Sequence, residues 1–303
     1  MFVLLAKQDF WNYSLNTSKM EKIKQLYRFL SPRFQTLFSE YKVDMRPRYG
    51  HGKPPHDLLY SIIDSNRQEY VRILNHALEC KEQLQAIKRS DENTLTELPA
   101  WNNGFLPGLD IVGIYAMLSL FKPKKYLEVG SGNSTKVSNL AKKQKGLDLQ
   151  IISIDPMPRA EIDALADKVV RRPFETVDHS ELLDLEENDV LFIDNSHRIL
   201  PNSDAMVFFM EILPKLKKGV IVHIHDIYLP YDYPQFMCDR FYTEQYGLAM
   251  YILANPSRYQ TILPNYFIFE DAELSKQISP MWDHPNLKGV ETHGGSYWIR
   301  IGE

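Results

Sequence analysis

The sequence YLEVGSGNST at residues 126–135 constrains the fold more than any other part of the chain. Its apolar beginning, up to Val129, predicts a buried strand. Gly130 and Gly132 then allow a tight turn and a close approach of the backbone to a ligand. The segment therefore predicts a strand that ends in a ligand-binding turn.

A helix is predicted to follow this turn over residues 136–145. Ser134 or Thr135 can cap its start, and Gly146 can end it. A strand, a glycine turn and a helix in this order place a nucleotide-like ligand at the carboxyl end of the strand. Glu128 stands just before the turn, where a carboxylate suits a cationic or hydroxyl-rich ligand better than a pyrophosphate.

Composition excludes several classes of protein. A chain of 303 residues can bury one large core, or one core and a smaller module. A net charge of −4 gives no support for nucleic-acid binding, which usually needs a basic face. Cys80 and Cys238 lie far apart without CxxC spacing, which argues against a disulfide scaffold or zinc site and fits a reducing compartment.

Membrane association is also not expected. No run approaches the roughly 20 apolar residues that span a bilayer, and the apolar start at residues 1–6 is too short for a signal peptide. We therefore expect a cytoplasmic protein without nucleic-acid or membrane partners.

Two regions are predicted along the chain. Residues 1–100 form a helical amino-terminal module, because residues 18–40 and 56–88 carry apolar residues at helical spacing. This module is expected to act as a lid, a substrate contact or a dimer contact in a possible homo-oligomer. Residues 101–303 alternate between strands and helices and form the second domain.

This alternation predicts a doubly wound, mostly parallel sheet of seven strands with helices on both faces and an antiparallel edge. Strands are predicted at residues 125–129, 149–154, 169–170, 189–193, 220–225, 259–269 and 296–301. Helices are predicted at residues 110–120, 136–145, 159–166, 201–216 and 239–253.

Acidic residues recur where the predicted strands end. Glu128, Asp155, Asp194 and Asp226 each close a strand, and ligands of open parallel sheets bind outside the carboxyl ends of the strands. Asp155 follows Gly130 by 25 residues, near the spacing of an acid that accepts hydrogen bonds from ribose hydroxyls.

The EVGSG segment at residues 128–132 and Asp155 resemble the first and second motifs of class I S-adenosylmethionine (SAM)-dependent methyltransferases. The resemblance implies a Rossmann-like fold and SAM as cofactor. It implies that Asp155 binds the ribose, that Phe174 lies near the adenine, and that Glu128 supports the loop or the amino group. The residues implied to bind the cofactor are Glu128, Gly130, Ser131, Gly132, Asn133, Ser134, Asp155, Pro156, Phe174 and Asp194.

A narrower resemblance rests on EVGSGNST at residues 128–135, DNSH at 194–197 and HDIYLPYDYP at 225–234. Together these motifs are similar to a bacterial group of methyltransferase-like proteins related to small-molecule and sugar O-methyltransferases. The resemblance implies O-methylation of a hydroxylated small molecule, such as a sugar, a glycan precursor or a secondary metabolite. It does not name the acceptor.

Methyl transfer requires an acceptor that is held in line with the methyl group and deprotonated when it is an alcohol. A positioned base contributes roughly 10²–10⁴-fold. In metal-dependent sugar O-methyltransferases the acid that matches Asp194 binds a metal, and a histidine three residues later, here His197, is the base. Asp226 matches a further ligand. His225 stands where magnesium would prefer oxygen, and imidazole suits iron, zinc or nickel better. A magnesium ion, a transition metal and no metal all stay open.

Other interpretations remain. A nicotinamide-dependent oxidoreductase would have glycine or alanine where Thr135 stands. A methyltransferase fold that only binds its ligand, and a metal-dependent hydroxylase on the same fold, are also possible. The His225/Asp226 pair keeps the hydroxylase open. Independently of these classes, Asp194 and Asp226 could be helix caps or ion-pair partners and His197 a solvent-facing loop residue, while His223 is expected to be a hydrogen-bonded core histidine.

Overall fold

The computed structural model describes residue 23 and residues 26–32, 34–37, 40–158 and 162–303. The chain divides into two compact units, Met1–Asp44 and Met45–Glu303. Of the segment expected to be helical at residues 18–40, Ile23 and residues 26–30 are helical, residues 31–32, 34–37 and 40 are not, and the other ten lie outside the described residues. The division lies between Asp44 and Met45 rather than near residue 100, so the module expected at residues 1–100 stays a prediction.

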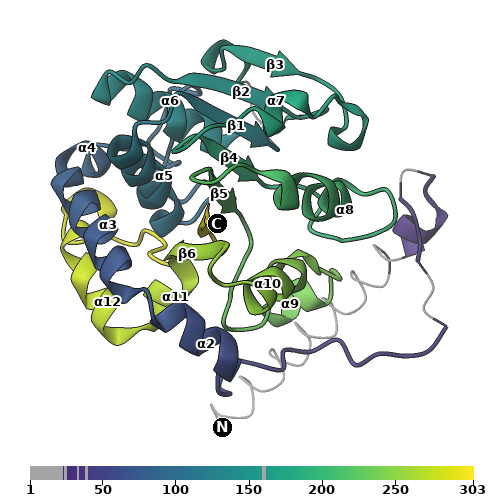
Figure 1. The fold of residues 1–303 in the computed structure, drawn as a ribbon. Helices are drawn as coiled ribbons and strands as arrows, with labels where there is room; N and C mark the ends of the chain where they lie inside the picture. Colours follow the sequence, from purple (N-terminus) through teal and green to yellow (C-terminus); the bar gives the residue numbers. More distant parts are fainter. Residues whose placement is uncertain (1–22, 24–25, 33, 38–39, 159–161) are drawn as a thin grey trace, which may run out of the picture. The chain divides into compact units, whose positions relative to one another are not determined.

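Seven strands form one sheet in the order β3-β2-β1-β4-β5-β7-β6 (Figure 1). In chain order they are β1 (Lys125–Val129), β2 (Gln150–Ile154), β3 (Lys168–Val170), β4 (Val190–Ile193), β5 (Ile221–Ile224), β6 (Tyr259–Pro264) and β7 (Tyr297–Ile301). The strands β1 to β5 pair in parallel, and β7 runs antiparallel to both β5 and β6. The predicted mostly parallel seven-stranded sheet is confirmed, with the antiparallel strand inserted between β5 and the edge strand β6.

The α-helices from residue 57 onward range from four to fourteen residues in length. They are α2 (Asp57–Asp64), α3 (Arg67–Glu79), α4 (Lys81–Gln85), α5 (Gly108–Phe121), α6 (Asn133–Lys145), α7 (Ser180–Leu183), α8 (Asp204–Val207), α9 (Gln235–Cys238), α10 (Glu244–Ala254), α11 (Asn265–Glu270) and α12 (Ala272–Ile278). Helix α3 packs against α5 and α12, and α2, α3 and α4 all belong to the larger unit. Among the described residues, no helix is both long and apolar enough to cross a bilayer.

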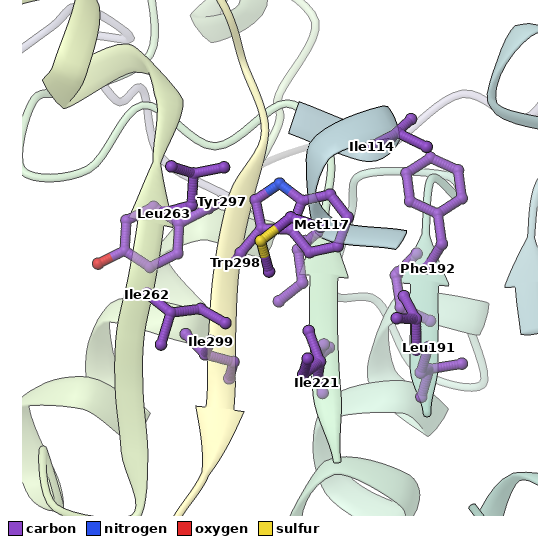
Figure 2. Packing of buried hydrophobic residues seen from close by; sticks show 14 of the residues in the cluster. Ile114, Met117, Leu191, Phe192, Ile221, Ile262, Leu263, Tyr297, Trp298 and Ile299 are labelled. Carbon is purple, nitrogen blue, oxygen red and sulfur yellow. The ribbon is translucent and has the colours of Figure 1, made fainter. Parts of the chain in front are cut away.

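The core lies between the sheet and its helices. All residues of β4 and β5 are buried, because helices cover a mostly parallel sheet on both faces. Figure 2 shows Ile114 and Met117 of α5 in one buried cluster with side chains of β4, β5, β6 and β7. Trp298 of β7 stacks on His223 of β5 at 3.8 Å between ring centroids. His223 also contacts the Ser296 hydroxyl at 2.6 Å and is a core histidine, as expected.

Several boundaries were predicted wrongly. The strand expected at residues 259–269 ends at Pro264, and Asn265–Glu270 is helix α11. The helix expected at residues 201–216 is divided into α8, a π-helical turn (Phe208–Ile212) and a 3₁₀ turn (Leu213–Lys215), where Pro214 lacks the N–H of a continuing helix.

Two further helices also differ from their prediction. The helix expected at residues 159–166 is a 3₁₀ turn at Asp163–Leu165 in its described part. The helix expected at residues 239–253 begins later, at Glu244, after the short helix α9.

Candidate functional site

The glycine turn is fixed by its contact with the end of β4. Gly130 has a φ angle of +84°, and a Cβ atom at this position would lie 1.9 Å from the carbonyl oxygen of Asp194. No other residue fits here without a shift of the backbone. The turn and the end of β4 are therefore held together as one structure.

Helix α6 begins earlier than predicted, at Asn133, with Gly132 at the cap position. Ser134 and Thr135 are not caps of a later helix. Their hydroxyls donate to the carboxylate of Glu128, which is fully buried beneath the turn. Burial raises the pKa of Glu128 to about 8, although these two donors oppose the shift. The side chain of Glu128 thus holds the first turn of α6 in place.

Asp155 links the turn to the end of β2. One of its carboxylate oxygens accepts the N–H of Ser131 at 2.9 Å, and the other accepts the N–H of Met157 at 2.8 Å. Asp155 and Gly130 line a cavity of about 370 Å³ with Pro156 and the buried Phe174. This nucleoside cavity, as we call it, lies outside the carboxyl ends of β1, β2 and β4.

A second cavity, of about 310 Å³, lies on the other side of the turn. Ser131, Gly132, Asn133 and Ser134 form one wall of this turn cavity, and residues of the 90–106 segment form the other. The amide of Asn133 donates to Asn103 in that segment at 3.1 Å. The segment before α5 therefore closes over the glycine turn.

A third cavity, of about 360 Å³, holds the acids and histidines that follow β4 and β5. Asp194, His197, His225 and Asp226 lie on one side of it. Aromatic side chains from separate loops surround them, namely Phe105, Tyr228, Phe236 and Tyr242. Asp194 lines this acceptor cavity and both cavities described above.

The four polar residues form a compact cluster. The Nε2 atom of His197 lies 3.6 Å from Oδ1 of Asp194 and 3.5 Å from Oδ2 of Asp226. The Nδ1 atom of His225 lies 3.6 Å from Oδ1 of Asp194 and 3.6 Å from Oδ1 of Asp226. Two imidazoles thus face the same pair of carboxylates from strand ends that are adjacent in the sheet.

A buried carboxylate contacts the second ring nitrogen of each imidazole, the one that faces away from Asp194 and Asp226. Glu244, at the start of α10, contacts Nδ1 of His197 at 2.5 Å, and Asp110, on α5, contacts Nε2 of His225 at 3.1 Å. Burial opposes protonation of His197, but the carboxylates of Glu244, Asp226 and Asp194 together raise its pKa to about 9. Burial likewise opposes protonation of His225, whose pKa its acidic neighbours raise well above the usual value.

The backbone at this cluster is strained. His197 and Asp226 have φ angles of +60° and +56°, in the left-handed region that residues other than glycine rarely occupy. Such positions cost ~1–3 kcal/mol each and occur most often at functional sites. The strain turns both side chains toward the acceptor cavity at the cost of local stability.

Asp110 and Glu244 were missed by sequence reasoning. Asp110 is the only charged residue in the apolar helix α5, and a lone acid on such a face was the one signal that could have found it. Glu244 resembles an ordinary acid in the first turn of a helix, where it would complement the helix dipole.

The aromatic residues near the carboxyl ends of the strands divide into two groups. Tyr228 lines the acceptor cavity, whereas Tyr297 and Trp298 are buried within the sheet. The loop at residues 46–56 contacts the segment that follows β5, since the N–H of Arg48 donates to Asp232 at 2.9 Å.

Part of the chain is similar to known proteins. Residues 127–227 match the family model described as a methyltransferase domain. No curated protein matches the chain. Among solved structures, an S-adenosylhomocysteine (SAH)-bound methyltransferase of Podospora anserina is 14% identical with a TM-score of 0.39, over 75% of this chain and 88% of that one. An O-methyltransferase of Bacillus cereus in complex with SAH is 14% identical with a TM-score of 0.36, over 77% and 91%.

The family match confirms the resemblance inferred from the sequence. Residues 127–227 span β1 to the end of β5, which is the part of the chain that carries the glycine turn and the strand-end acids. Residues 127–227 are therefore similar to a methyltransferase domain, and the sheet that carries them has the Rossmann-like order predicted from the sequence.

Proposed function

We propose that the protein transfers the methyl group of SAM to a hydroxyl oxygen of a small molecule, such as a sugar, a glycan precursor or a secondary metabolite, with the assistance of a divalent metal. The observation that carries this proposal is the position of Asp194, which lines the nucleoside, turn and acceptor cavities alike. A methyl donor and an acceptor in these cavities would meet at this residue.

The two cavities beside the glycine turn fit the two halves of SAM. In the nucleoside cavity, the carboxylate of Asp155 can accept hydrogen bonds from ribose hydroxyls, and the rings of Pro156 and Phe174 can pack against the adenine. The turn cavity presents the loop from Ser131 to Ser134 to the amino-acid part. SAM supplies an activated methyl group on sulfur, and the chain holds the acceptor oxygen in line with it.

The acceptor cavity fits a divalent cation. The ligands expected from the sequence are Asp194, His225 and Asp226, and Nδ1 of His225 lies 3.6 Å from a carboxylate oxygen of each acid. Among the described residues, the group whose donor atoms all lie within 4.8 Å of one another is Asp194, His197 and Asp226, so His197 is a second candidate ligand. A bound cation would orient the acceptor hydroxyl and favour its deprotonated form. Asp194 would then connect the cation with the cofactor.

His197 is proposed as the general base. Its Nδ1 atom is held by Glu244, and its pKa is raised to about 9, so the ring becomes a base when it loses its proton toward alkaline pH. In that neutral form the lone pair of Nε2 points into the acceptor cavity. The ring stacks on Tyr242 at 4.4 Å between centroids, which fixes its plane. From this position Nε2 can take the proton of an acceptor hydroxyl as the methyl group is transferred.

The aromatic walls restrict the entry of water. Phe105 comes from the segment before α5, Tyr228 from the loop after β5, and Phe236 and Tyr242 from the region of α9.

We further propose that residues 1–100 act as a lid or dimer contact. The proposal is supported by residues 90–100 of this region, several of which line the turn cavity.

A metal-dependent hydroxylase is the second candidate. The observation that favours it is that His197 and His225 both face Asp194, since two histidines and one carboxylate also bind iron in oxygenases. A protein that binds SAM without transferring its methyl group is the remaining alternative.

Calorimetry and a turnover assay test the proposal. SAM and SAH are expected to bind in the micromolar range, NAD is not, and SAH is expected to accumulate when SAM is mixed with suitable members of a panel of nucleotide sugars and catechols. Binding of NAD in place of SAH would refute the cofactor assignment. Oxygen-dependent product formation without SAH release would favour the hydroxylase.

A further inference from the structure

We propose that the acceptor carries an anionic group, a phosphate or a carboxylate, which Arg240 and Arg198 bind at the acceptor cavity. This inference rests on the methyl transfer proposed above and names the chemical class of its acceptor. It gives a role to two arginines that lie outside the motifs recognised in the sequence.

Arg240 is the one lysine or arginine among the described residues that line the acceptor cavity. Its guanidinium carbon lies over the ring of Tyr242, 4.9 Å from the centroid, and the guanidinium carbon of Arg198 lies 5.9 Å from the same centroid. The aromatic ring attracts each cation, but two cations beside one ring repel each other. An anion bound by both would remove this repulsion.

The two arginines are held at a fixed place relative to the proposed base. Three hydrogen bonds join the segment of His197 to the segment of Arg240. Nε of Arg198 donates to the carbonyl of Arg240, the N–H of Thr243 donates to the carbonyl of His197, and the N–H of Ile199 donates to the Thr243 hydroxyl, each at 2.9 Å. An acceptor bound through its anionic group would therefore present its hydroxyl to the base in one orientation.

The backbone between Arg240 and Tyr242 is strained. Phe241 has a φ angle of +59°, in the left-handed region, as His197 and Asp226 do. The side chain of Phe241 is exposed, so its own packing does not explain the strain. Both neighbours of Phe241 line the acceptor cavity, and strained positions occur most often at functional sites.

No protein carboxylate neutralises these two guanidinium groups. Elsewhere in the chain, Arg67 pairs with Asp271 at 2.8 Å. In the part of the chain that the structure describes, no carboxylate lies within ion-pair distance of Arg198 or Arg240, and the strand-end acids of the cavity face the two imidazoles instead. The two cations are therefore available to a ligand.

The chemistry of the guanidinium group selects the ligand. Its planar set of N–H donors binds carboxylate or phosphate through two parallel hydrogen bonds. Phe105 and Phe236, each 56% exposed, line the same cavity and can cover the apolar face of a ring. The acceptor that fits is a hydroxylated ring with an acidic substituent, such as a sugar phosphate, a uronic acid or a hydroxybenzoate.

Calorimetry with probes that differ by one acidic group tests this inference. Inositol phosphate is compared with inositol, glucuronate with glucose, and gallate with pyrogallol. The full-length protein is saturated with SAH and freed of divalent cations, so that no metal can bridge to the anion. We expect the acidic member of at least one pair to bind about 10–100-fold more tightly than its neutral partner. A preference confined to inositol phosphate would assign phosphate, and one confined to glucuronate or gallate would assign carboxylate.

Substitution of the arginines tests which groups bind the anion. Arg240→Gln should abolish the preference for acidic probes, whereas Arg240→Lys, which keeps the charge but not the paired donors, should retain part of it. Arg198→Gln should weaken the same probes about 10-fold. SAH binding by each variant measures folding, because the nucleoside cavity includes neither arginine.

Arg258→Gln is the matched control. Arg258 also lies over a tyrosine ring, that of Tyr259, at 5.9 Å from the centroid. It donates to the carbonyl oxygens of Pro214 and Leu216 and lines none of the three cavities. This variant should bind every probe as the parent does.

The outcomes separate this inference from the proposed function. Equal binding within every pair, or no binding of any acidic probe to a protein that binds SAH, would overturn the inference and leave SAM-dependent methyl transfer standing. A preference that the folded Arg240→Gln variant keeps would overturn the role of Arg240, and parental binding by Arg198→Gln would remove Arg198 from the site. A protein that binds acidic probes through Arg240 but releases no SAH from SAM with them would contradict methyl transfer to these acceptors and not the anion site.

Discussion

Replacement of Gly130 by alanine tests the contact on which the site depends. The added Cβ atom would lie 1.9 Å from the carbonyl oxygen of Asp194 and 2.9 Å from its carbonyl carbon. Both are backbone atoms, so the turn and the end of β4 would have to separate by about 1 Å. Because Asp194 lines all three cavities, this movement would disturb the cofactor and acceptor sites together.

The magnitude follows from two contributions. A φ angle of +84° costs a residue with a Cβ atom about 1–2 kcal/mol, and forced overpacking adds about 1–3 kcal/mol. The free energy of unfolding should therefore fall by about 2–5 kcal/mol, which leaves a typical domain folded. A misplacement of about 1 Å at a reacting centre can lower the rate about 10²-fold, so turnover should fall further than stability alone suggests.

Gly146→Ala is the matched control. Gly146 ends α6 with a φ angle of +59°, and an added Cβ atom would meet nothing within 4 Å. The free energy of unfolding of the Gly146→Ala variant should fall only by the backbone contribution of about 1–2 kcal/mol, and this variant should bind SAH as the parent does. Urea denaturation gives the free energies, and calorimetry with SAH gives the affinities. Equal stability and equal SAH affinity of the two variants would refute the reasoning.

The other predictions concern single carboxylates and the proposed base. Asp155→Ala should weaken SAM binding by about 1.5–3 kcal/mol through lost hydrogen bonds to a charged group, and calorimetry showing parental affinity would exclude Asp155 as the ribose ligand. His197→Ala should abolish SAH release in the acceptor assay while SAM affinity stays within about 2-fold, since only the base is removed; full turnover would assign the base elsewhere. Glu128 has its pKa raised to about 8 in the folded protein, so the native state keeps its proton where the unfolded chain loses it. Stability should therefore fall as the pH rises from about 4.5 to about 8, and Glu128→Gln should flatten this dependence in thermal unfolding at pH 5 and pH 9; parallel pH profiles would show that Glu128 is ionised in the native protein.

The sheet and the turn were predictable because their signals are local. The start and end of β1 were predicted without error, since an apolar run that ends in glycine needs no distant contact to be recognised. Helix α6 was found, but its start was not, because the pairing of Ser134 and Thr135 with Glu128 across the turn decides where the helix begins. Boundaries that depend on tertiary contact, such as the end of β6, were predicted least well.

Asp194 and Asp226 were predicted from strand-end positions, and His197 and His225 from the resemblance to metal-dependent O-methyltransferases. The structure brings all four together, but the carboxylates of Asp110 and Glu244 that contact the two histidines were not foreseen. Asp110 and His225 are 115 residues apart, and Glu244 and His197 are 47 apart. No spacing rule connects such pairs, because only the folded sheet brings α5 and α10 against the ends of β5 and β4.

The features that escaped prediction share a physical reason. A buried acid on an apolar helix and left-handed backbone at His197 and Asp226 each oppose stability when considered alone. Sequence rules that consider only neighbouring residues favour stable local structure, so they do not predict the buried acid or the left-handed residues. Their concentration at one end of the sheet, around one cavity, indicates that the rest of the fold stabilises an arrangement whose value is chemical. Asp110 shows this most directly, because its four hydrogen-bonded contacts offset the cost of burial only while the backbone of Gly295 and Ser296 and the ring of His225 remain where the proposed metal site requires them.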